Sequence, residues 1–404
     1  MKNLTVKIND LKTYSISQLH PGTVKHLEKG HPWITLDKIS EKFPTNCFFL
    51  NYQGTLFLHD PMNKKIRGRF WGKTKDLKLN VELDFESELK KRIELSLKKR
   101  DQFHFKRQHY YLVFGEADLL PGIHIIKLDN HYIILSYTHF WFQFKKHFIE
   151  ALPNENIWWQ DREVQASKQT PPLLWNKLTQ SFLPSTITFP ILENNCKMNV
   201  YLGQRYDTGI YTDMASIRQK LFSNPDFSIG KTFLNLFSYT GIFSICALKS
   251  GALKATSIDL SKWANIEEQN NSQLNDIDPK THQVINGDIF QGLQTLKKQA
   301  QIFDCIILDP PSSFTVKQKR VSIIELYGKI LREILPLTKK QTLLYCFLNH
   351  HSTTERKFLE LIQHELKLAR VSATLQILKV LDEDCPTLPY FPEGNYLKCV
   401  VITF

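Results

Sequence analysis

The stretch "FLNLFSYTGIFSICA", residues 233–247, decides the fold of the C-terminal half of the chain. An apolar run leads through a polar turn into a second apolar run, which is the pattern of a strand followed by a helix. The turn contains a single glycine, Gly241, whereas a dinucleotide-binding loop has the spacing G-x-G-x-x-G so that its backbone can approach a pyrophosphate. The stretch is therefore either a binding loop for a ligand without phosphates or a plain connection between a strand and a helix.

Strand-like and helix-like segments alternate from about residue 201 onward, which predicts β-α-β units and a parallel sheet. Helices are expected to begin at Gly241 and Ser261 and to span 321–335. The final apolar segments "ARVSATLQILKVL" and "NYLKCVVITF" have no helix between them and are expected to form an antiparallel pair that closes the sheet. The expected parallel strands are "KTFLNLF", "KATSID", "HQVINGD", "FDCIILD" and "TLLYCFL".

Polar residues end four consecutive predicted strands, where an open parallel sheet binds its ligands. Asn235 leaves the first strand, and Asp259 closes the second, where a carboxylate accepts both ribose hydroxyls. Asp288 ends the third strand, in position for an adenine amino group, and Asp309 ends the fourth in "ILDPP". Each acid alone could be a helix cap or a loop residue, but four polar residues in succession favour a cofactor pocket. The single glycine suits S-adenosylmethionine, which needs no phosphate cradle.

Composition limits the remaining classes of protein. The 404 residues are 42% hydrophobic and 23% charged, which is ordinary globular composition with room for two or three domains. The N-terminus has no apolar run after Lys2, and no segment approaches 18 uncharged apolar residues, so we expect a cytoplasmic protein without a membrane span. Seven scattered cysteines, none in C-x-x-C spacing, predict reduced thiols and no metal site.

The positive charge predicts a polyanionic partner. The net charge is +12, and residues 61–110 hold 15 Lys and Arg against 7 Asp and Glu. Part of this excess lies on "ESELKKRIELSLKKRDQF", where Leu89, Ile93 and Leu97 form one buried helical stripe and leave the basic residues, Arg100 included, on other faces. A solvated helix face is the alternative reading of this run. The cations expected to bind RNA phosphates in this region are Lys64, Lys65, Arg67 and Arg69.

Several motifs together resemble those of the bacterial 23S rRNA cytosine-C5 methyltransferases, a family of class I S-adenosylmethionine-dependent enzymes. The segment "EKGHPWI" resembles the start of the family's N-terminal PUA domain, "LVFGEADLLPGI" its middle domain, "TGIYTDMASIR" the entry to its catalytic domain and "YFPEGNYLK" its C-terminal signature. The catalytic motifs resembled, in order, are "NLFSYTG", "IDLS", "NNSQLN", "NGDIF" and "IILDPPSSF".

The resemblance implies an α/β protein with three domains and assigns roles to single residues. Strand and helix patterns divide the chain into a small all-β module at 1–80, an α+β domain at 81–200 and an α/β domain at 201–404. The resemblance implies that these are a PUA domain that binds RNA, the family's middle domain and a Rossmann-like class I methyltransferase domain. Asp309 stands at the junction of cofactor and target base, and Asp213 and Arg218 form the polar pair of the entry segment, with Arg218 directed to RNA. Pro310 and Phe314 would clamp the base. The implied S-adenosylmethionine site consists of Asn235, Phe237, Tyr239, Gly241, Asp259, Asp288 and Asp309.

This chain departs from the family at three places. Met214-Ala215 follows Asp213 where the family has Gln-Arg, and Tyr111 replaces a middle-domain arginine. The third departure concerns the nucleophile, because methylation of cytosine C5 requires a thiolate that adds to C6. The family's cysteine aligns with Leu348, and Cys346 lies two residues earlier, on the same face of an extended strand.

We therefore expect a methyltransferase of 23S rRNA with cytosine C5 as the leading target and Asp309 and Cys346 as catalytic residues. A base nitrogen is the alternative target, since it needs positioning and no thiolate. A degenerate methyltransferase that binds rRNA without catalysis, as an assembly factor, is the alternative from another class. We expect RNA as the partner, with no membrane, and we leave a homodimer open.

Overall fold

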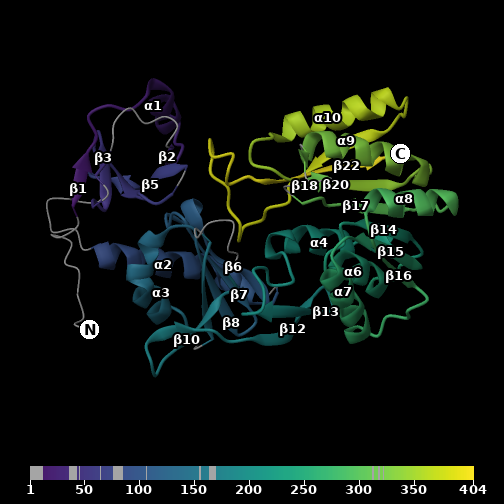
Figure 1. The fold of residues 1–404 in the computed structure, drawn as a ribbon, viewed down its shortest axis with the longest axis horizontal. Helices are drawn as coiled ribbons and strands as arrows, with labels where there is room; N and C mark the ends of the chain where they lie inside the picture. Colours follow the sequence, from purple (N-terminus) through teal and green to yellow (C-terminus); the bar gives the residue numbers. More distant parts are fainter. Residues whose placement is uncertain are drawn as a thin grey trace. The chain divides into compact units, whose positions relative to one another are not determined.

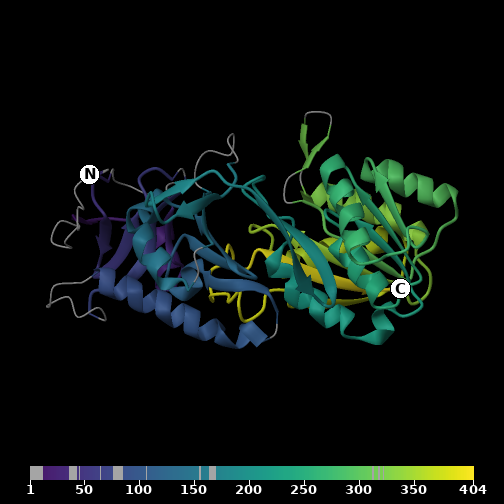
Figure 2. The same cartoon turned by 90° about the horizontal axis from the view of Figure 1, so that it is seen from below.

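The computed structural model describes residues 12–35, 43–44, 46–63, 65–75, 85–105, 107–153, 156–162, 170–311, 314–316, 319–321 and 323–404. The chain forms two compact units that alternate along the sequence (Figures 1 and 2). The first comprises Met1–Ile187, Leu202–Asp207 and Glu383–Gly394. The second comprises Thr188–Tyr201, Thr208–Asp382 and Asn395–Phe404.

A five-stranded sheet forms the N-terminal part of the first unit, with strand order β1-β3-β4-β5-β2. β1 pairs with β3 in parallel, and the other neighbours are antiparallel. The sequence predicted a small all-β module here, and the described residues add one short helix to it. The elements are β1 Thr13–Ser15, α1 Pro21–Glu28, β2 Trp33–Thr35, β3 Phe49–Tyr52, β4 Thr55–His59 and β5 Ile66–Lys73.

A six-stranded sheet with two α-helices follows, in the order β11-β10-β9-β8-β7-β6. Its neighbours are antiparallel except for β8 and β9, which are parallel. The two sheets share one apolar core, because Leu58 and Trp71 of the first sheet pack with Phe85 and Leu89 of α2. The elements are α2 Phe85–Arg100, β6 His109–Phe114, β7 Ile123–Leu128, β8 His131–Ser136, α3 Lys145–Ala151, β9 Ile157–Asp161, β10 Leu173–Asn176 and β11 Ser181–Leu183.

Helix α2 buries the apolar stripe that its sequence predicted, but it also buries a cation that the pattern placed on the surface. Leu89 and Ile93 are fully buried, and Lys98 and Lys99 are exposed as expected. The prediction for Arg100 is wrong: both terminal nitrogens of its guanidinium donate to the Asp118 carboxylate at 2.7 Å. The carboxylate also accepts the backbone N–H of Phe114. Arg100 therefore joins α2 to the six-stranded sheet and offers no surface charge.

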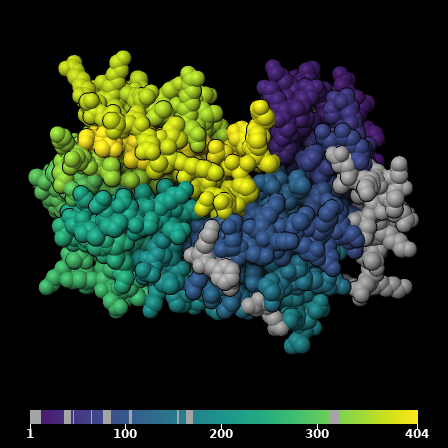
Figure 3. Space-filling view, turned by 180° about the vertical axis from the view of Figure 1, so that it is seen from behind, coloured from purple at the N-terminus to yellow at the C-terminus, as the bar shows by residue number. Residues whose placement is uncertain are grey.

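A segment from the end of the sequence completes the first unit. Glu383–Gly394, yellow in Figure 3, lies against the six-stranded sheet, where the Asp384 carboxylate accepts the backbone N–H of Tyr111 at 3.0 Å. Arg107 forms an ion pair with the same carboxylate at 2.5 Å. Further along the segment, Phe391 packs edge-on against Trp33 with 4.7 Å between ring centroids. Tyr111, which replaces an arginine of the family pattern, thus contributes its backbone N–H to the contact between the six-stranded sheet and the segment Glu383–Gly394.

A two-stranded ribbon leads into the second unit. β12 (Ile187–Glu193) and β13 (Cys196–Leu202) are joined by Asn194 and Asn195, whose φ angles are 50° and 61°. Two left-handed residues in succession form the tight turn that matches the twist of a hairpin, and asparagine tolerates this conformation well.

A seven-stranded sheet forms the centre of the second unit, in the order β16-β15-β14-β17-β20-β22-β21. The first five of these strands are parallel, and β22 pairs antiparallel with both β20 and β21. The predicted parallel sheet and its antiparallel closing pair are thus confirmed. The strands are β14 Thr232–Leu236, β15 Lys254–Asp259, β16 His282–Asn286, β17 Cys305–Leu308, β20 Leu343–Asn349, β21 Thr374–Leu378 and β22 Leu397–Thr403.

Helices cover both faces of this sheet (Figure 1). On one face, α8, α9 and α10 enclose an apolar core that includes Leu344, Cys346 and Leu348 of β20. On the other face, Phe243 of α6 packs against Phe347 of the same strand, because successive side chains of a strand alternate between faces. The helices are α4 Ala215–Phe222, α5 Pro225–Ser228, α6 Ile242–Lys249, α7 Lys262–Leu274, α8 Ile289–Lys298, α9 Ile323–Ile334 and α10 Glu355–Leu368, and the short strands β18 Phe314–Val316 and β19 Lys319–Val321 precede α9.

Within the described ranges, every helix is too short or too polar to cross a membrane.

Replacing Arg100 by alanine should lower the free energy of unfolding by about 3–5 kcal/mol, because the buried Asp118 carboxylate would lose both bonds to the guanidinium and keep, as its cation, only the exposed Lys99 ammonium 3.5 Å away. Chemical denaturation monitored by circular dichroism measures this loss. Lys98→Ala, on the exposed side of the same helix, is the matched control and should change the stability by less than about 0.5 kcal/mol. Equal effects of the two substitutions would contradict the structural role of Arg100.

Candidate functional site

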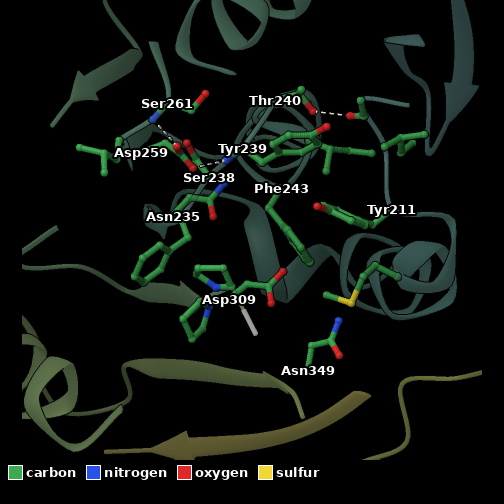
Figure 4. Close-up of a pocket in the computed structure, with 18 of the residues that line it drawn as sticks. Tyr211, Asn235, Ser238, Tyr239, Thr240, Phe243, Asp259, Ser261, Asp309 and Asn349 are labelled. Carbon is green, nitrogen blue, oxygen red and sulfur yellow. Dashed lines mark hydrogen bonds between the residues drawn. The ribbon is translucent and has the colours of Figure 1, made fainter. Parts of the chain in front are cut away.

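A cavity of about 580 Å³ lies at the carboxyl ends of the parallel strands in the second unit (Figure 4). Its volume falls within the range of small-molecule sites. All four polar residues predicted at strand ends line it: Asn235, Asp259, Asp288 and Asp309. Other lining residues include Tyr211, Asp213, Met214, Arg218, Phe237, Ser238, Tyr239, Phe243, Ser261, Pro310, Asn349 and Leu397.

The loop between β14 and α6 has an unusual backbone. Phe237 and Tyr239 have φ angles of 62° and 52°, and Gly241, which caps α6, has a φ of 83°. Left-handed conformations cost bulky residues about 1–3 kcal/mol and persist only where the surroundings impose them. The backbone N–H of Phe237 donates to the carbonyl of Ile258 at 2.9 Å, which ties the loop to the neighbouring strand β15. Strain of this kind concentrates at binding sites, so it favours the reading of residues 233–247 as a binding loop.

The single glycine of the loop has a local structural cause. A Cβ atom at Gly241 would lie 2.3 Å from Cγ of Glu268, a residue of α7 that is fully buried. Only glycine therefore allows both the left-handed turn and the close approach of α7. The sequence left open whether this glycine belongs to a binding loop for a ligand without phosphates or to a plain connection, and the structure explains the glycine by packing behind the loop.

Asp259 connects the loop to the next strand end. Its Oδ2 accepts the backbone N–H of Tyr239 at 2.9 Å, and its Oδ1 accepts that of Ser261 at 2.8 Å. Burial raises the pKa of this carboxyl above its usual range, although hydrogen bonds from the backbone N–H groups of Tyr239, Leu260 and Ser261 act in the opposite direction. Each carboxylate oxygen has two lone pairs, so both can accept a further hydrogen bond from a ligand hydroxyl.

Asp288 has a structural role in addition to its place in the cavity. It is the N-cap of α8, and its Oδ1 accepts the backbone N–H groups of Phe290 and Gln291. The reading as a helix cap, which the sequence left open, is therefore correct, and its presence in the cavity wall is confirmed as well. Its second oxygen, Oδ2, is the atom that could accept a hydrogen bond from a ligand amino group.

Asp309 has the most perturbed carboxyl in the cavity. Burial raises its pKa to about 7, and the nearby Asp213 carboxylate adds to the shift. Asp213 itself accepts a hydrogen bond from the Tyr396 hydroxyl at 2.7 Å. A carboxyl with a pKa near 7 exchanges protons readily at neutral pH, which suits a group that accepts a proton or a hydrogen bond during catalysis.

Aromatic and amide side chains complete the cavity, and the sequence did not single them out. Tyr211 packs on Tyr239 with 5.2 Å between ring centroids, and Phe243 lies beside them in Figure 4. Asn349 ends β20, and in Figure 4 it lies on the side of Asp309 that faces away from Phe243. Tyr211 lies within the quoted entry segment, two positions before Asp213, and Asn349 directly follows Leu348. The resemblance named those neighbouring positions but assigned no role to Tyr211 or Asn349.

Cys346 is not in the cavity, which corrects its predicted role as a nucleophile. Its side chain is fully buried in the core between the sheet and α9, and burial raises the pKa of its thiol strongly. Leu348, two residues closer to the strand end, is also fully buried. All seven cysteines of the chain lie in described positions and are buried, and none of them lines the cavity. A thiolate therefore cannot reach a base in this conformation.

Two arginines predicted to bind RNA are buried in ion pairs. Arg218 lines the cavity, but its Nε and a terminal nitrogen donate to Glu193 at 2.5 and 2.7 Å. Arg69 is only 3% exposed and donates to Glu116 at 3.0 Å. Neither guanidinium is available to an RNA phosphate, so both predictions are corrected.

The remaining residues that were predicted to contact RNA or the target base differ in their exposure to solvent. Lys65 is exposed, whereas Arg67 is half-buried and donates to the Pro61 carbonyl. Lys64 lies outside the described residues, and so does the side chain of Phe314. Pro310 lines the cavity next to Asp309, as expected for a clamp on a ligand ring.

Comparison with known proteins identifies similar sequences and folds. Residues 180–401 match the model of a family described as S-adenosylmethionine-dependent methyltransferase. Ribosomal RNA large subunit methyltransferase I of Serratia proteamaculans is 27% identical over 94% of this chain and 97% of its own. YwbD of Bacillus subtilis, provisionally named as a ribosomal RNA large subunit methyltransferase, is 29% identical over 72% of this chain and 74% of its own. The crystal structure of SMU.776, a protein classed as a methyltransferase and complexed with S-adenosylhomocysteine, has a TM-score of 0.81 at 23% identity and covers 97% of this chain and 100% of its own.

The buried position of Cys346 makes a direct prediction. In the folded protein its thiol should resist iodoacetamide under conditions in which the urea-unfolded chain is fully alkylated, as measured by mass spectrometry of its tryptic peptide. Cys346→Ala should leave the binding of S-adenosylhomocysteine within about twofold and destabilise the fold by roughly 1 kcal/mol, since it removes a small buried group. Rapid alkylation of the native protein would show that the strand end opens and would restore Cys346 as a candidate nucleophile.

Proposed function

Because the chain belongs to the S-adenosylmethionine-dependent methyltransferases, we propose that it transfers the methyl group of this cofactor to a base of large-subunit ribosomal RNA. Two observations support the choice of substrate. Full-length relatives bear the name of ribosomal RNA large subunit methyltransferases. Residues 61–110, in the first unit, hold 15 Lys and Arg against 7 Asp and Glu, and Lys90, Lys91 and Lys98 of α2 are exposed. We further propose that the five-stranded sheet is a PUA domain that contributes to RNA binding.

The residues of the cavity fit S-adenosylmethionine. We propose that the free lone pairs of Asp259 accept the two ribose hydroxyls and that Asp288 Oδ2 accepts the adenine amino group. Phe237, Tyr239 and Asn235 would surround the rest of the molecule, with Gly241 shaping the loop. The bound cofactor supplies an electrophilic methyl group on its sulfonium, so the protein needs to present only a nucleophilic atom in line with it.

We propose a base nitrogen as the target atom, in place of the cytosine C5 that the resemblance favoured. The buried position of all seven cysteines carries this choice, because methylation at C5 requires a thiolate at the site. A nitrogen has its own lone pair and needs orientation and removal of a proton. Asp309, with a pKa near 7, would accept that proton or hydrogen bond, and Pro310 would contact the plane of the base.

Mapping the modified nucleotides of rRNA tests this function. Large-subunit rRNA from cells of the source organism that lack the gene should lose one methylated base, and fragmentation in the mass spectrometer should place the methyl group on a nitrogen. Loss of a 5-methylcytidine would refute the nitrogen target and require movement of Cys346. An unchanged set of modifications would favour the alternative function, an assembly factor that binds rRNA without catalysis.

The role of Asp309 predicts a pH dependence with a definite sign. If the ionised carboxylate is the active form, the rate of methyl transfer should fall below pH 7, to about one-tenth at pH 6, and Asp309→Asn should remove this dependence together with most of the activity. Single-turnover assays with tritiated cofactor measure the profile. A rate that is flat between pH 6 and 8 would contradict the assignment.

Thermal unfolding gives an independent check on the same carboxyl. Its pKa is raised in the folded state, so between about pH 4 and 7 the folded chain holds a proton that the unfolded chain has released. This group therefore destabilises the fold progressively as the pH rises through that window. Asp309→Asn should melt at a higher temperature than the wild type at pH 8, and the difference should shrink towards pH 4.

A further inference from the structure

A buried pair of titratable side chains lies directly behind the cofactor loop and has no role in the chemistry described so far. Glu268 of α7 and His282 of β16 have side chains that are 0% and 2% exposed. Oε1 of Glu268 lies 3.0 Å from Nε2 of His282. Neither residue lines the cavity, so neither touches a ligand there.

Hydrogen bonds hold both ends of the imidazole ring. The Ser272 hydroxyl lies 2.8 Å from His282 Nδ1 and also donates to the backbone oxygen of Glu268 at 2.8 Å. At the other end of the ring, Nε2 lies 3.0 Å from Glu268 Oε1.

Both residues are connected to the cofactor loop. Glu268 Oε2 accepts the hydroxyl of Ser238, a loop residue in the cavity wall, at 2.7 Å. Glu268 also occupies the space that a side chain at position 241 would need. On the other side, His282 Nε2 lies 3.2 Å from the Ser257 hydroxyl, which lies 2.7 Å from that of Ser244.

The connection from Ser244 returns to the first strand end. The Ser244 hydroxyl accepts a hydrogen bond from Asn235 Nδ2 at 3.0 Å, and Asn235 lines the cavity. One continuous buried network thus begins at Asn235, passes through Glu268 and His282, and ends at Ser238. It supports the strained loop from both of its sides.

We propose that Glu268 and His282 are positioning residues, which hold the loop of residues 235–241 in the conformation that binds S-adenosylmethionine. A loop with left-handed residues at 237 and 239 does not keep that shape without external support. The Glu268 carboxylate supplies this support, since it can accept hydrogen bonds from Ser238 and His282 at the same time. Replacing a buried polar pair by apolar side chains of similar size often costs little stability, so we assign this pair a conformational function.

The double variant Glu268→Met with His282→Leu separates binding from stability. Apolar replacement of the whole pair should leave the melting temperature within a few degrees of the wild type. The dissociation constant of S-adenosylhomocysteine, measured by calorimetry well below that melting temperature, should rise at least tenfold because the loop loses its support. Ser238→Ala should weaken binding three- to tenfold, since the loop loses its hydrogen bond to the Glu268 carboxylate.

Thr256→Val is the matched control. Thr256 is fully buried in the same strand as Ser257, and its hydroxyl has no hydrogen-bond partner among the described residues, so binding should change less than twofold. Dissociation constants within twofold of the wild type for both the double variant and Ser238→Ala would overturn the proposal. If the double variant does not fold, Ser238→Ala alone decides. A wild-type protein that does not bind S-adenosylhomocysteine would contradict the cavity assignment itself and overturn this proposal with it.

Discussion

The convergence of five parallel strands at one edge of a sheet is the constraint on which the site depends. Parallel strands joined by right-handed crossovers all end on the same side, so residues far apart in sequence meet there. Asn235, Asp259, Asp288 and Asp309 come from four such strand ends and line one cavity. The polar groups in this cavity differ in role because their surroundings differ: Asp259 fixes the loop, Asp288 caps a helix, and Asp309 is the carboxyl whose burial brings its pKa near neutrality.

In the loop that follows β14, packing within the protein explains the glycine, and no phosphate-binding fingerprint is needed. A phosphate-binding loop uses several glycines because the ligand approaches its backbone. Here the close approach comes from within the protein, where Glu268 occupies the space beside Gly241. The remaining strained positions carry Phe237 and Tyr239, which gain side-chain contacts that glycines would lack. The site therefore combines a rigid backbone with aromatic walls, an arrangement suited to a cofactor without phosphates.

The sequence predicted the strands and helix starts of the second unit well, but it did not predict which charged side chains are buried. Alternating apolar runs located the strands and helix starts of the second unit, since periodicity depends on neighbours in the chain. The ends of the predicted strands located the four polar residues of the cavity. The resemblance to a known family added Phe237, Tyr239 and Pro310, which line it, and Gly241, which shapes the loop behind it. Arg69, Arg100 and Arg218 were all expected on surfaces or at RNA, yet each is paired with a carboxylate at least 18 positions away. Such long-range pairs leave no local pattern in the sequence. The burial of Cys346 leaves none either, because an apolar strand has the same sequence pattern whether its face is covered by a helix or open to a ligand.

In the proposed binding mode, the cavity at the strand ends binds S-adenosylmethionine through Asp259 and Asp288 and directs its methyl group towards Asp309. A crystal structure of the protein with S-adenosylhomocysteine tests this mode most directly. We expect ribose hydroxyls at hydrogen-bond distance from Asp259, the adenine amino group at Asp288 and the sulfur on the side of the cavity that holds Asp309, with Cys346 still buried. A nucleoside bound elsewhere, or a sulfur that faces away from Asp309, would contradict it.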